Sequence, residues 1–254
     1  MKKFRIPALV GAALLVAVQP AQAQVSKQAV LDTYANVAQA MYADALTEAR
    51  KLQAAVNKLI AQPSKANMDA ARKAWLATRV PYQQTEVYRF GNKIVDDWEG
   101  KVNAWPLDEG LIDYVDKSYG TTSKDNPLYT ANVIANKSIK IGNKTVDTSK
   151  ITKELLSETL HEAGKVEANV ATGYHAIEFL LWGQDLNGTG PGAGNRPWTD
   201  YGKANCTHGN CDRRAAYLKV ATDLLVDDLA WMVDQYARMT DGLNRLTKAA
   251  RHGA

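Results

Sequence analysis

The stretch "DRRAAYLKVATDLLVDDLAWMVDQY", residues 212–236, decides the fold class. Apolar residues recur in it every three or four positions, which is the period of an amphipathic α-helix with one buried face. The predicted buried stripe comprises Tyr217, Leu218, Ala221, Leu224, Leu225, Leu229, Met232 and Tyr236. Because a helix of this length buries such a stripe against other helices, the stretch predicts a helical bundle.

The same period recurs nearer the N-terminus. Residues 26–61 predict a long helix whose buried stripe begins with Val30, Tyr34, Val37 and Met41. Residues 67–90 predict a second helix, in which Pro81 marks a kink or a new start. Its aliphatic face, predicted to meet the core, carries Leu76, Val80, Val87 and Phe90, and the neighbouring stripe carries Trp75, Arg79, Tyr82, Glu86 and Arg89.

Shorter elements are expected between these helices. A short helix near residues 108–115, a hairpin across Gly142-Asn143 and helices at 151–162 and 169–186 are predicted. Residues 183–211 hold seven glycines and two prolines and predict a long loop. The expected fold is all-α, a helical bundle with long connections.

The first residues are typical of an export signal. Lys2, Lys3 and Arg5 precede an apolar run, and Ala21-Gln22-Ala23 is a small-residue cleavage site. This pattern predicts a signal peptide at residues 1–23, followed by a domain at 24–254 in the periplasm or cell envelope. No later segment is apolar and long enough to predict a transmembrane helix.

Removing three basic residues lowers the formal net charge of the chain from +4 to +1. The remaining charges are mixed along the sequence, which gives no support to nucleic-acid binding. The two cysteines, Cys206 and Cys211, predict a disulfide in an oxidising compartment. The alternative adds His208 as a third zinc ligand, although structural zinc normally takes four ligands.

The candidate chemistry lies in "NVATGYHAIEFLLWGQDL", residues 169–186. The segment is apolar on nearly all sides, which predicts a buried helix, yet it carries His175 and Glu178 three residues apart on one face. In one interpretation Glu178 pairs with Arg79 or Arg89, and His175 is a satisfied core residue.

In the other interpretation His175 and Glu178 are metal ligands, with Glu86 or Asp108 completing the shell. Histidine with carboxylates suits iron or zinc. The pair is not a His-Glu-x-x-His zinc motif, because His161-Glu162 is followed three residues on by Lys165.

The sequence resembles the imelysin family. "GYHAIEFLLWGQD" carries the Gly-x-His-x-x-Glu motif of that family at Gly173, His175 and Glu178. Residues 75–115 and 211–233 resemble the blocks that precede and follow the motif in its iron-regulated protein A branch. The resemblance implies an all-α fold of two bundle halves with a site between them. It also implies export and a link to iron uptake, and the family carries a peptidase label.

The resemblance also implies site residues. His175 and Glu178 would be the central pair, with Arg79, Tyr82, Glu86 and Asp108 as neighbours, and Gly173 would allow a close backbone approach. Family members usually continue well past residue 236 through a second half, so much of that half is expected to be missing here. The chain is then either a short form or C-terminally truncated.

Three functions follow as hypotheses. The leading one is an exported protein that binds iron, or a small iron complex, and works with envelope iron-uptake proteins. The first rival is a zinc-type metallopeptidase that uses Glu178 and Glu86 in catalysis. The second rival is a non-catalytic docking module whose glycine-rich loop contacts a partner.

Overall fold

The computed structural model describes residues 26–252, with side chains described for residues 26–239 and 242. The predicted signal peptide therefore lies outside the described residues. The helices are α1 (Lys27–Ala61), α2 (Lys65–Gln84), α3 (Lys93–Val102), α4 (Glu109–Ile112), α5 (Gly173–Trp182) and α6 (Cys211–His252). Strands β1 (Ser138–Ile141) and β2 (Lys144–Asp147) form the predicted hairpin, so the fold is mainly helical, as expected.

Short turns of helix connect these elements. The 3₁₀ turns are η1 (Thr85–Tyr88), η2 (Lys117–Tyr119), η4 (Ala163–Lys165) and η5 (Trp198–Tyr201). The segment predicted as a helix at 151–162 contains η3 (Leu155–Leu160), which is π-helical: the His161 amide donates to Leu156 O, five residues back.

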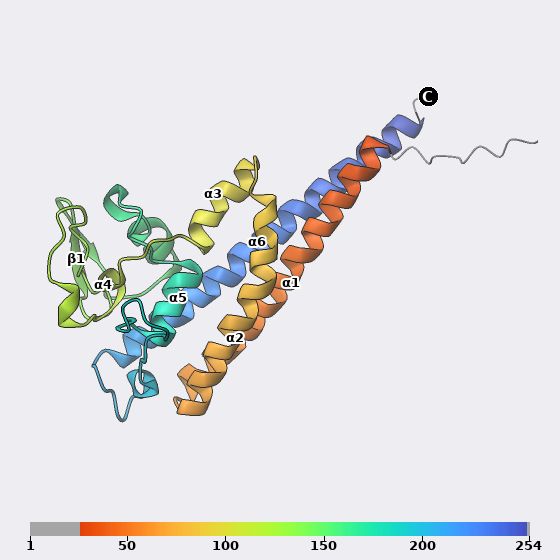
Figure 1. The fold of residues 1–254 in the computed structure, drawn as a ribbon. Helices are drawn as coiled ribbons and strands as arrows, with labels where there is room; N and C mark the ends of the chain where they lie inside the picture. The colour runs from red at the N-terminus through yellow and green to blue at the C-terminus, as the bar shows by residue number, and fades with distance from the viewer. Residues whose placement is uncertain (1–25, 253–254) are drawn as a thin grey trace, which may run out of the picture.

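The long helices pack through small and aromatic residues. α1 contacts both α2 and α6, and Figure 1 shows α1 and α6 side by side along most of their length. Ala35, Ala38, Ala45 and Ala49 on α1 are fully buried, and such small side chains let helices approach closely. The predicted stripe of α6 is confirmed, since all eight of its residues are buried.

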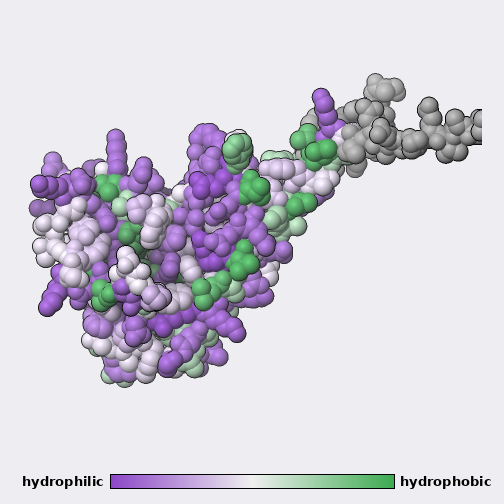
Figure 2. All heavy atoms as spheres, in the orientation of Figure 1, coloured by the Kyte–Doolittle hydropathy of each residue, from purple (hydrophilic) through white to green (hydrophobic). Residues whose placement is uncertain are grey.

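The predicted core faces of α2 and of the start of α1 were wrong. Leu76, Val80, Val87 and Phe90 are 56%, 58%, 66% and 98% exposed, and Val30, Tyr34 and Val37 are also largely exposed. α2 instead buries Trp75, Thr78 and Tyr82 toward α1 and α5, the neighbours that it contacts. Figure 2 shows a mostly hydrophilic visible face that carries a few separate groups of hydrophobic residues.

The chain between α3 and α6 forms a separate cluster beside the long helices (Figure 1). It contains the hairpin, α4 and α5, with α5 in contact with α6 and α2. The predicted disulfide is confirmed: Cys206 and Cys211 are bonded to each other, which rules out a zinc site that uses both thiolates. Among residues 26–252, no helix has the length and hydropathy needed to cross a bilayer.

The different burial of α6 and α2 leads to a stability test. Leu225 is fully buried, so Leu225→Ala should lower the free energy of unfolding by about 2 to 5 kcal/mol. Val80 is 58% exposed, so Val80→Ala should change it by less than about 0.5 kcal/mol. Urea unfolding followed by circular dichroism measures both values. Equal losses in the two variants would contradict this placement of α2.

Candidate functional site

Helix α5 is held in the interior by side chains of other segments, which donate hydrogen bonds to its backbone carbonyl groups. Trp75 Nε1 donates to Tyr174 O at 3.0 Å, and Tyr201 OH donates to Leu180 O at 2.6 Å. Arg72 Nη2 donates to Leu181 O at 2.9 Å. These donors come from α2 and η5, so several segments together set the position of α5 and of every side chain that it carries.

Gly173 sets where α5 begins. Its φ is +78°, and a Cβ atom built there would lie 2.4 Å from Val102 O, at the end of α3. Beside it, Thr172 Oγ1 donates to Lys101 O at 2.8 Å. The glycine therefore allows the backbone of α5 to start directly against α3, which only a residue without a side chain can do.

His175 and Glu178 contact each other. His175 Nδ1 lies 3.0 Å from Glu178 Oε2, and the two side chains are 18% and 42% exposed. The Trp105 ring lies 5.0 Å from the His175 ring. The interpretation in which Glu178 pairs with an arginine is not supported: Arg79 donates to Asn103 Oδ1 at 2.6 Å, and Arg89 pairs with Glu99 at 3.1 Å.

The pair lies on the wall of a cavity of about 450 Å³. Glu109 from α4 and Asp185 from the loop after α5 line the same cavity. The remaining lining residues are Trp75, Leu76, Trp105, Leu107, Phe179, Trp182, Gly183, Gly192, Ala193 and Gly194. The cavity is thus mainly apolar, with one imidazole and three carboxyl groups.

Glu109 is a cavity residue whose pKa is strongly shifted. Burial raises the pKa of its carboxyl group to about 7; Arg196 opposes the rise, and Asp185 and Glu178 add to it. Glu109 was missed at the sequence level, where the adjacent Asp108 was chosen. Asp108 instead accepts a hydrogen bond from Asn126 Nδ2 at 2.6 Å.

Within the part of the chain that the structure describes, Arg79, Tyr82, Glu86 and Asp108 are outside the lining of this cavity. Arg79 stacks over the Tyr174 ring, with 4.8 Å between its guanidinium carbon and the ring centroid. Tyr82 is buried, and its ring lies 4.7 Å from the Tyr174 ring. Glu86 is exposed on η1. Any effect of these four residues on binding would be indirect.

Whether this cavity can hold a metal ion depends on how many ligand atoms point to one place. Among the described residues, no group of three or more histidine, cysteine, aspartate or glutamate side chains is arranged to hold an ion. His175 and Glu178 supply one nitrogen and one oxygen donor, whereas zinc takes four ligands. These two residues alone therefore fall short of a complete zinc site, and any ion held there would need further donors such as water or a small ligand of its own.

Comparisons with known proteins identify the family of this chain. A family model described as imelysin matches residues 38–252. Iron-regulated protein A from Synechococcus elongatus is 31% identical over 101 residues, which are 39% of this chain and 28% of that protein.

The fold is also similar to a crystal structure of a proposed iron-regulated protein A precursor from Parabacteroides distasonis. The two share 22% identity with a TM-score of 0.52, over 84% of this chain and 46% of the other. The chain therefore spans less than half of either relative. Since the family model covers most of the chain, this protein belongs to the imelysin family.

Proposed function

We propose that this protein is exported and binds iron, directly or as a small complex, at His175 and Glu178 in periplasmic iron acquisition. The observation that carries the proposal is the contact of 3.0 Å between these two donors on the wall of a cavity. The family and the iron-regulated relative support the link to iron. Envelope iron-uptake proteins are the partners that we propose.

The charge of the cavity supports a cation as the ligand. Glu178, Glu109 and Asp185 bring carboxyl groups to this cavity, and the like charges on Glu178 and Asp185 help to raise the pKa of Glu109. A bound cation would relieve this repulsion by pairing with the ionised forms. The imidazole of His175 adds a nitrogen donor, and nitrogen with carboxylate oxygen suits iron or zinc better than magnesium.

The central test is metal binding by ligand variants. Titration calorimetry of the full chain with ferric citrate, and separately with zinc chloride, should show binding by the unaltered protein. His175→Ala and Glu178→Gln should each weaken it by at least about tenfold, because each removes a donor.

Glu158→Gln is the matched control. Glu158 is exposed and also precedes a histidine by three residues, in Glu158-x-x-His161, but lies outside the cavity lining among the described residues. It should bind like the unaltered protein. Equal affinity in all four proteins would reject the His175 and Glu178 site.

Glu109 should make cation binding depend on pH. With a pKa of about 7, its carboxyl group is mostly neutral at pH 6 and mostly ionised at pH 8. Zinc affinity should therefore rise over this range, and the rise should be smaller in Glu109→Gln, which cannot ionise there. His175 is present in both proteins, so the difference between their affinity curves reports on Glu109. Parallel affinity curves from pH 6 to 8 would exclude this role of Glu109.

Peptidase activity is the second candidate function, and Glu109 is the observation that favours it. A general base works best with a pKa near the working pH, and Glu109 lies in the same cavity as the donor pair. Glu86, the base suggested by the sequence, is outside that lining among the described residues. A library of unstructured peptides should then be cleaved by the zinc-loaded chain.

That cleavage should be lost with a chelator and fall by at least about a hundredfold in Glu109→Gln, since general base catalysis contributes that much or more. Glu86→Gln is the control and should retain the activity. Metal binding without any cleavage would leave iron binding as the function and remove this candidate.

A further inference from the structure

A buried network of four charged side chains lies under the loop that follows α5. Arg196 Nη1 donates to Asp113 Oδ2 at 2.7 Å and to Asp200 Oδ2 at 3.0 Å. Arg214 donates to the same carboxylate, from Nε to Asp113 Oδ2 at 2.6 Å and from Nη2 to Asp113 Oδ1 at 3.0 Å. All four side chains are at most 1% exposed. Two arginines balance two aspartates, so the network is formally neutral.

One edge of the Arg196 guanidinium makes no hydrogen bond within the described residues. Within the described residues, Nε and Nη2 are buried and have no hydrogen-bond partner. These two nitrogens lie on the same edge, so their N–H bonds are parallel and match the two oxygens of a carboxylate or phosphate. A buried donor without a partner costs about 1 to 3 kcal/mol, which makes such an edge unusual in a folded protein.

The plane of the guanidinium is fixed by rings. Its carbon lies 4.8 Å from the Tyr114 ring centroid and 5.3 Å from that of Phe179. Tyr114 OH also donates to Asp200 Oδ2 at 2.6 Å, which ties the ring to the network. The edge is therefore held in one orientation before any ligand arrives, and this lowers the entropic cost of binding.

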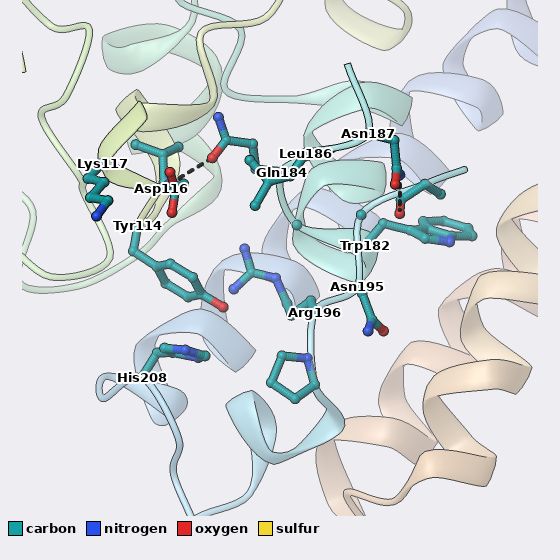
Figure 3. Close-up of a pocket in the computed structure, with 15 residues that line it drawn as sticks. Tyr114, Asp116, Lys117, Trp182, Gln184, Leu186, Asn187, Asn195, Arg196 and His208 are labelled. Carbon is teal, nitrogen blue, oxygen red and sulfur yellow. Dashed lines mark hydrogen bonds between the residues drawn. The ribbon is translucent and has the colours of Figure 1, made fainter. Parts of the chain in front are cut away.

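Arg196 lines a second cavity, of about 520 Å³, and Figure 3 shows its guanidinium near the centre of the residues drawn. This volume is in the range of small-molecule sites. Trp182, Leu186 and Pro197 give the cavity apolar surface, and the neighbouring Asp116 and Lys117 add one charge of each sign. The cavity shares Trp182, Gly183, Ala193 and Gly194 with the His175 cavity, so one wall separates the two.

We propose that this second cavity binds a small organic monocarboxylate, which the Nε and Nη2 edge of Arg196 holds through two hydrogen bonds. The apolar lining would pack against the organic part of the ligand. A single negative charge fits better than two, because the carboxylates of Asp113 and Asp200 lie beside the same guanidinium. Both nitrogens are covered and Gly183 lies beside Nε, so the proposal requires the chain at Gly183 to move as the ligand enters.

The test observes Arg196 directly. In the ¹⁵N-labelled full chain, the arginine Nε–H signal that disappears in Arg196→Lys is that of Arg196. Titration with phenylacetate should move this signal. Phenylacetamide, which has the same ring without the charge, and sodium chloride should not move it. Tighter binding of inorganic phosphate than of phenylacetate would overturn the assignment to a monocarboxylate.

Variants make the result specific. Arg196→Lys keeps the charge but loses the paired edge, and should weaken phenylacetate binding about tenfold, equivalent to about 1.4 kcal/mol. Arg213→Lys is the matched control: Arg213 is also buried, but it donates to the carbonyls of Ile134 and Val133 and lies outside the lining among the described residues. It should bind phenylacetate normally.

Leu186→Trp tests the cavity without touching the ion network, since Leu186 is 63% exposed on the rim. The larger tryptophan side chain should fill the cavity and abolish phenylacetate binding. This test remains valid even if Arg196→Lys fails to fold. His175→Ala should leave phenylacetate binding unchanged, which separates this site from the proposed metal site. An Arg196 signal that stays fixed at saturating phenylacetate, or equal binding by Leu186→Trp, would refute the proposal.

Discussion

The fixed position of α5 is the constraint on which the site depends. Its carbonyl groups at Tyr174, Leu180 and Leu181 accept hydrogen bonds from Trp75, Tyr201 and Arg72. A helix held in this way cannot rotate about its axis without breaking bonds to two other segments. The face that carries His175 and Glu178 therefore stays turned toward the cavity, and the apolar faces stay in the core.

Periodicity predicted the elements better than it predicted their faces. The stripe of α6 has a single apolar face, and its burial could be read directly from the sequence. α2 has two competing stripes, and hydrophobicity alone favoured Leu76 and Val80. The structure buries Trp75 and Tyr82 instead, because these larger rings pack edge-on or tilted against Tyr174 of α5, and Trp75 also donates a hydrogen bond there. Which stripe wins depends on the neighbouring helix, which a single sequence does not specify.

The motif located His175 and Glu178, but the residues around this pair were not predictable. Glu109 and Asp108 are adjacent in the sequence, and the orientation of a four-residue helix decides which one enters the cavity. The arginine network joins residues 113, 196, 200 and 214, which have no common spacing. Its partners meet because the loop after α5 folds back over the start of α6. Such long-range pairing leaves no periodic signal in the chain.

Gly173 changes how the Gly-x-His-x-x-Glu motif should be interpreted. Its first position serves backbone packing, because the carbonyl of Val102 occupies the space of a side chain. The other two positions carry chemical groups. The three letters thus combine a requirement for assembly with a requirement for chemistry, and the two can diverge during evolution. A homologue that keeps the glycine but loses the imidazole or the acid would preserve the junction between two helices while abandoning whatever the pair once held.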